Sequence, residues 1–250
     1  MKDTVTMSYV NMFAVLKTLE NLCELDEESK EIVSCDPISI GFSVKNGPKA
    51  TLFFGGGKCR MEEGAHGRIK LFLSSPDHFN AMVDGTKNPL PYGGLLRLNF
   101  LLKDFTRLTE ILTKYLKASA EDLKDRTFFE KSTTLMFHLV ANALSAVGNY
   151  DSLGCCSKQS LPDGVISMEI SDCVYASIVM RDGCLTTLHE HAANPRSYMI
   201  FKNYDVARGL FSGSLDSMSC LARGDLAMKG YIPQIDNLNR ILNRVSVYLS

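Results

Sequence analysis

The feature that most limits how this chain can fold is an internal repeat of strands and turns. Within 38–57, a stretch of alternating apolar and polar residues, a turn and a second apolar run end in three glycines. The same order returns within 165–183, where the second run ends in Asp182-Gly183, a strong hairpin sequence. Gly57 and Gly183 are 126 residues apart. The sequence therefore predicts two units that begin with the same strands.

Each half continues with another strand and a short helix whose ends are marked in both halves. Ser75 and Asn203 are residue types that cap the N-terminus of a helix. Gly85 and Gly213 supply the left-handed conformation that commonly ends one. Both pairs are 128 residues apart. Because caps and stops agree as well as hydrophobicity, we expect the same short helix in both units.

Each half closes with an amphipathic helix, at 105–116 and at 238–249. Helical sequence also precedes the strands of each half. The two closing helices are offset by 133 residues, so small insertions separate the halves. Apolar periodicity stops at 117–125, where small and charged residues take over. We therefore predict two domains, 1–118 and 119–250.

Composition and charge exclude several classes of protein. The 27 basic and 28 acidic residues give a net charge of -1, so the basic surface of a nucleic-acid binder is not expected. No apolar stretch is long enough to span a membrane, and the N-terminus lacks the pattern of a signal peptide. Eight scattered cysteines form no Cys-x-x-Cys pair and are expected to be free thiols. These features predict a cytoplasmic protein without stable membrane insertion.

Motifs for catalysis, metals and cofactors do not emerge. Gly55-Gly56-Gly57-Lys58 lacks the first glycine and the hydroxyl residue of a phosphate-binding loop. His189-Glu190-His191 has no third metal ligand at a suitable spacing and is expected at an exposed strand end. The segment 154–159 is predicted to be an exposed loop. We expect no catalytic residue, no metal and no cofactor, and hence a protein that is not an enzyme.

The order of elements and the glycine positions resemble the sterol carrier protein 2 family, in two divergent tandem copies. The second half carries the family's glycine and Asx pattern after the short helix, at Gly213, Asp216, Gly224, Lys229 and Gly230. The first half matches only in part, with Gly85, Asn88 and Pro89, while Gly94 has no second glycine after it. The resemblance implies an α+β fold in two tandem similar units, each a mixed, mainly antiparallel sheet covered on one face by helices.

The resemblance also implies an apolar cavity between sheet and helices that binds a fatty acyl or sterol-like lipid. Eight residues are predicted to line it, namely Phe79, Met82, Val83, Val206, Leu210, Phe211, Met218 and Leu221. The second unit is expected to be the better lipid site. Three functions stay open: carriage of a hydrophobic ligand, a structural or interaction module with filled cores and a protein partner or homo-oligomer, and an accessory subunit of an enzyme.

Overall fold

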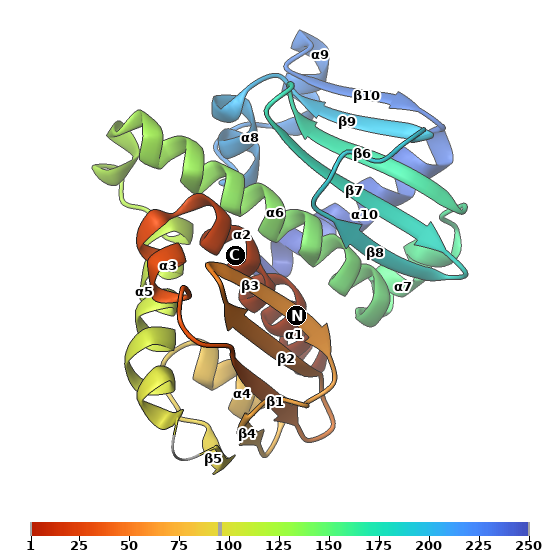
Figure 1. Cartoon of the computed structure of the whole chain (residues 1–250). Coiled ribbons are helices and arrows are strands. Elements are labelled where there is room, and N and C mark those ends of the chain that lie inside the picture. The colour runs from red at the N-terminus through yellow and green to blue at the C-terminus, as the bar shows by residue number, and fades with distance from the viewer. Residues whose placement is uncertain (1, 95–96, 250) are drawn as a thin grey trace. The chain divides into compact units, whose positions relative to one another are not determined.

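The computed structural model describes residues 2–94 and 97–249, and their contacts divide the chain into two units. The N-terminal unit spans Asp3–Lys131, and the C-terminal unit runs from Ser132 to the end of the chain (Figure 1). The helix α6 (Arg126–Tyr150) crosses from one to the other. The sequence placed the boundary earlier, between 118 and 119.

The N-terminal unit has a five-stranded sheet. Helical segments precede its first strand, lie between β4 and β5, and follow its last strand. Its strands are β1 (Ile38–Val44), β2 (Lys49–Gly55), β3 (Lys58–Glu63), β4 (Ile69–Leu73) and β5 (Leu90–Gly93). Its helical segments are α1 (Thr4–Val10), η1 (Asn11–Val15), η2 (Leu16–Thr18), α2 (Leu19–Leu25), α3 (Glu27–Ile32), α4 (Pro76–Val83), η4 (Phe100–Phe105), α5 (Thr106–Leu116) and η5 (Asp122–Lys124).

This sheet is mixed, with the order β3-β2-β1-β4-β5. Only the central pair, β1 with β4, is parallel, and the other neighbours are antiparallel. Six of the seven residues of β1 are buried, so both faces of this central strand are covered. The apolar side chains from Ile38 to Val44 lie on one face, and the backbone of Gly67 crosses the other face at Gly41. The mixed sheet covered by helices confirms the predicted α+β class.

The C-terminal unit repeats this architecture. Its strands are β6 (Gly164–Ile170), β7 (Val174–Arg181), β8 (Cys184–Leu188), β9 (Ser197–Phe201) and β10 (Leu226–Gly230). Its helices after α6 are α7 (Ser152–Gln159), α8 (Tyr204–Phe211), α9 (Ser217–Arg223) and α10 (Ile232–Leu249). The strand order is β8-β7-β6-β9-β10, again with one parallel pair in the centre. The two units therefore share the same strand order and are built from similar helices and strands.

The caps predicted from the sequence form in both units. Ser75 accepts a hydrogen bond from the backbone of α4, and Asn203 accepts the equivalent bond from α8. A second shared feature lies where the chain crosses the outer face of each sheet to reach the parallel strand. Thr51 Oγ1 donates to the Gly64 carbonyl, and Ser177 Oγ donates to the Glu190 carbonyl. Both hydroxyls belong to buried residues at the same place in the pattern, so they hold the two crossovers alike.

The structure corrects two details of the sequence interpretation. Residues 154–159 form most of the helix α7, because Asp151 accepts a hydrogen bond from the Gly154 backbone and caps it. The sequence pattern treats Gly94 as the first of two glycines, with the second one missing, but in the structure Gly94 corresponds to the second glycine of the other unit, Gly230. A Cβ on Gly94 would meet the Arg68 carbonyl, and a Cβ on Gly230 would meet the Arg196 carbonyl. Gly224 instead ends α9, and the N-terminal unit has no helix between α4 and β5.

Among the described residues, no helix is both long enough and apolar enough to cross a membrane.

Candidate functional site

The eight residues predicted to line a cavity lie in different environments. Phe79 and Val206 are buried, and Met218 is 71% exposed. The other five are half-buried: Met82, Val83, Leu210, Phe211 and Leu221.

Two of these residues belong to aromatic clusters that pack each unit. Phe79 lies edge-on to Phe42, with ring centroids 6.4 Å apart. Phe211 lies 5.3 Å from Phe201 and 6.4 Å from Phe137, again between ring centroids. These separations are ordinary for packed aromatic pairs. Phe79 and Phe211 therefore contribute to the packing of their units.

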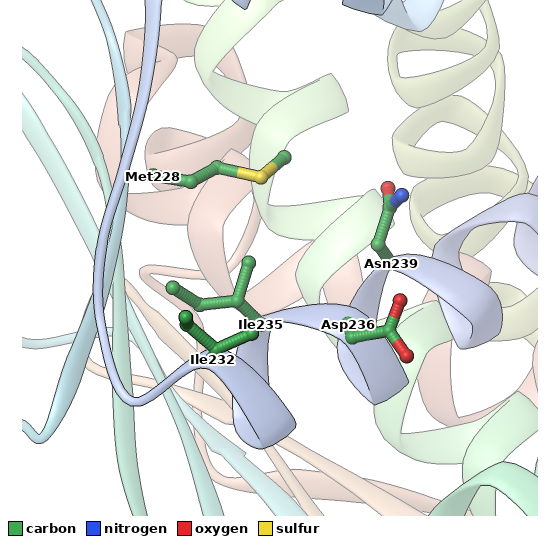
Figure 2. A pocket seen from close by; sticks show the side chains of 5 residues that line it. All are labelled: Met228, Ile232, Ile235, Asp236 and Asn239. Atoms are coloured by element: carbon green, nitrogen blue, oxygen red, sulfur yellow. The ribbon is translucent and has the colours of Figure 1, made fainter.

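A hollow of about 310 Å³ lies elsewhere in the C-terminal unit, between the edge strand β10 and the beginning of α10 (Figure 2). Five side chains line it, and none is among the eight predicted ones: Met228, Ile232, Ile235, Asp236 and Asn239. Like the predicted cavity, the hollow lies in the C-terminal unit between the sheet and a helix. The helix is α10, whereas the predicted residues of this unit lie on α8 and α9.

Strand register and helix periodicity explain why these side chains converge. Met228 pairs with Met199, whose buried side chain faces the helices, so Met228 points to the same side of the sheet. The four lining residues of α10 are spaced by three and four positions, which places them on one face of the helix. That face is distinct from the buried stripe of Leu238, Ile241, Val245 and Tyr248.

The hollow has an apolar part and a polar part. Figure 2 shows Ile232 and Ile235 side by side, Met228 extending from β10 across the hollow from them, and Asp236 and Asn239 further along the helix. Ile232 is 75% exposed, so a large apolar side chain at the hollow is open to water. The Asp236 carboxylate pairs with the Arg240 guanidinium at 3.0 Å, one helical turn further along.

Buried polar contacts hold α10 in place beside the sheet. Gln234 accepts a hydrogen bond from Ser197 Oγ at 2.8 Å and donates to the Pro162 carbonyl at 3.1 Å. Near its other end, Arg244 and Tyr248 both donate to the buried Asp151 carboxylate. Because α10 is fixed at both ends, the side chains that line the hollow are held by a rigid element.

The Asp151 contacts have an electrostatic consequence. Burial by itself raises the pKa of this carboxyl, but hydrogen bonds from Arg244, Tyr248 and the Gly154 backbone outweigh it and lower the pKa to about 2. Asp151 is therefore ionised at neutral pH and is part of the framework of the unit.

The buried stripe of α10 was predictable from the sequence, whereas the residues that line the hollow were not among the predicted ones. Ile232 and Ile235 precede that stripe, and Met228 lies between Gly224 and Lys229, where only the glycine pattern was considered. Pro233 was an available signal, since proline favours the first turn of a helix and marks the start of α10 earlier than 238.

Two histidines that the sequence did not connect form a second polar cluster in this unit. The rings of His138 and His189 lie 4.6 Å apart, and His189 Nε2 is 3.0 Å from Asn142 Oδ1. Burial lowers the pKa of His138 to about 4, so His138 is neutral at physiological pH. The described residues contain no group of three or more metal-binding side chains, so this pair is not part of a larger ligand set.

A comparison of the sequence with known protein families gives no match, and a comparison with characterised proteins gives none either.

Comparison with solved structures gives several partial likenesses. A UbiJ-SCP2 ubiquinone synthesis protein is 14% identical over 43% of this chain and 88% of its own, with a TM-score of 0.34. The sterol carrier protein domain 2 of Helicoverpa armigera is 12% identical over 45% of this chain and 89% of its own, with a TM-score of 0.37. The sec-alkylsulfatase Pisa1 from Pseudomonas sp. is 11% identical over 58% of this chain and 28% of its own, with a TM-score of 0.27. The fold described above rests on the strand order and helices of the chain itself.

Proposed function

We propose that this protein binds a hydrophobic small molecule without transforming it, and that the hollow beside β10 and α10 is the binding site. The observation that carries the proposal is a concave surface formed by three apolar side chains with polar groups on one side. Binding sites for small molecules are typically concave and mostly apolar, with a few polar groups that orient the ligand.

The size of the hollow limits the ligand. Small-molecule sites usually enclose about 300 to 1,000 Å³. A volume of about 310 Å³ is at the lower end, which suits a medium-length alkyl chain or one end of a longer lipid. Covering Ile232 and its neighbours would remove apolar surface from water, and this supplies the driving force. The resemblance to the sterol carrier protein 2 family supports the same function.

Native mass spectrometry of protein purified without detergent, followed by organic extraction, tests whether a ligand is carried. We expect an additional mass of one small lipid per chain that extraction removes. A protein without additional mass that also fails to take up 1-decanol would contradict the proposal.

A pair of variants then tests the place of binding. Ile232→Lys puts a cation on the apolar side of the hollow and should lower the affinity for the neutral dye Nile red at least tenfold. Leu153→Lys is the matched control, because Leu153 is also exposed, at 56%, and lies on α7 rather than at the hollow. Equal effects of the two substitutions would place the dye elsewhere.

A second candidate function, binding of a protein partner, is favoured by the edge strand β5 of the N-terminal unit. Leu90 and Tyr92 on this strand are 59% and 58% exposed, and an uncovered strand edge can pair with another chain. An accessory role beside an enzyme would use such a surface. If β5 pairs with a second copy, light scattering should detect a dimer that Leu90→Lys dissociates, and a monomer at all concentrations would exclude that pairing.

A further inference from the structure

The polar side of the hollow is formed by groups whose charges already compensate one another. Asp236 lines the hollow, and its carboxylate lies 3.2 Å from Arg240 Nε and 3.0 Å from the terminal nitrogen Nη2 of the same residue. The Asn239 amide lines the same side and contributes one hydrogen-bond donor group and one acceptor without a net charge. The hollow thus offers hydrogen-bonding groups, and the acidic Asp236 lines it whereas its basic partner Arg240 does not.

This arrangement disfavours charged head groups of either sign. A fatty-acid carboxylate on the polar side would lie beside the Asp236 carboxylate, and like charges at short range repel. An ammonium group would have to compete with Arg240 for that carboxylate. A hydroxyl group meets neither cost, because it can donate to Asp236 and accept from Asn239.

From this geometry, and resting on the function proposed above, we infer that the ligand of the hollow is an uncharged amphiphile with a hydroxyl head group. Its alkyl part lies against Met228, Ile232 and Ile235, and its hydroxyl lies between Asp236 and Asn239 (Figure 2). The ligand class is therefore a neutral alcohol lipid, and free fatty acids are disfavoured by charge.

Three probes of equal chain length separate the head groups: 1-decanol, decanoate and decylammonium, titrated calorimetrically at low ionic strength. We expect 1-decanol to bind most tightly, with decanoate about fivefold weaker, since Asp236 is exposed and charge interactions at exposed groups amount to about 1 kcal/mol at most. The difference should shrink in high salt because screening weakens it.

Two substitutions should shift the preference in opposite directions. Asp236→Asn removes the repelling carboxylate and frees Arg240, so decanoate should bind as tightly as 1-decanol or more tightly. Arg240→Met exposes the carboxylate, so decylammonium should gain affinity. Asp182→Asn is the control, because it removes one acidic charge at the β7–β8 turn, where asparagine tolerates the left-handed backbone. It should leave the order of the three probes unchanged.

The possible results distinguish failure of the inferred head group from failure of the proposed binding site. Binding of all three probes with equal affinity, or tighter binding of decanoate or decylammonium to the unmodified protein, would overturn the inferred head group while the hydrophobic site remains. Failure of all three to bind would overturn both the site and the inference.

Discussion

The same Tyr–Asp hydrogen bond ties the amphipathic helices α5 and α10 to the start of an earlier helix in their units. Tyr115 donates to Asp26 at 2.8 Å, and Tyr248 donates to Asp151 at 2.6 Å. Each aspartate also caps a helix, α3 or α7. In the C-terminal unit Arg244 adds two hydrogen bonds to the more deeply buried carboxylate. The Tyr–Asp pair therefore makes the same connection in both units, and in the C-terminal unit an arginine hydrogen-bonds the aspartate as well.

The role of that charge partner gives a prediction about stability. Arg244→Met leaves the buried Asp151 carboxylate without its cation and should lower the free energy of unfolding of the C-terminal unit by about 3 kcal/mol. Arg240→Met, on the same helix but in an exposed pair, should lower it by less than about 1 kcal/mol. Urea denaturation followed by circular dichroism measures both. Similar small losses would mean that Asp151 does not depend on Arg244.

The buried His138 gives a prediction about pH. Its pKa is about 4 in the folded protein and 6.5 is its ordinary value, so the unfolded chain binds the proton more readily. The free energy of unfolding should therefore be unaffected by His138 above pH 6.5. It should fall by about 3 kcal/mol as the pH drops from 6.5 toward 4. His138→Leu should remove this part of the loss. A variant with the same pH profile as the unmodified protein would contradict the assignment.

At the scale of elements, the last strand of each unit leaves the sheet through a glycine that no other residue can replace without strain. Gly94 and Gly230 have φ values of +74° and +107°, and each approaches the carbonyl of the arginine that immediately precedes the neighbouring strand. Gly224, at +74°, ends α9 and has no other atom within 4 Å of the position of a Cβ. The three glycines therefore share a backbone conformation and differ in their surroundings.

That difference predicts graded effects of alanine. Gly224→Ala pays only for the left-handed backbone, about 1 kcal/mol. Gly94→Ala and Gly230→Ala also force Cβ against a carbonyl and should cost at least about 2 kcal/mol, because the edge strand must shift. The measurement is the midpoint of urea denaturation for each variant. Equal costs at all three positions would show that contact with the neighbouring strand is unimportant.

Element types were predictable from the sequence where local signals and periodicity agree. The alternating strands, the caps Ser75 and Asn203 and the Asp182-Gly183 turn follow from such signals, and the structure confirms them. The helix α7 was missed because its cap, Asp151, was overlooked before an irregular polar segment. The hollow was missed because its residues are brought together by strand pairing between β9 and β10, a contact that periodicity within one segment does not report.

At the scale of the whole molecule, the two units keep the same strand order and diverge in one region. After the short helix, the N-terminal unit passes to β5 through a proline-containing segment, whereas the C-terminal unit inserts α9 before β10. The final helices also begin differently, with the π-helical segment η4 in one unit and the regular helix α10 in the other. The hollow lies beside β10 and α10, so it is formed where the units differ. We therefore expect the C-terminal unit to carry the ligand.

The most direct test of this account is a comparison of two tryptophan substitutions for uptake of 1-decanol. Ile235→Trp should fill the hollow and abolish binding with little change in melting temperature, because the site is open to solvent. Leu210→Trp, on α8 and away from the hollow, should leave binding intact. The chain has no tryptophan of its own, so the fluorescence of each variant reports the environment of the new side chain. Loss of binding in Leu210→Trp with retention in Ile235→Trp would contradict the account and place the ligand beneath α8.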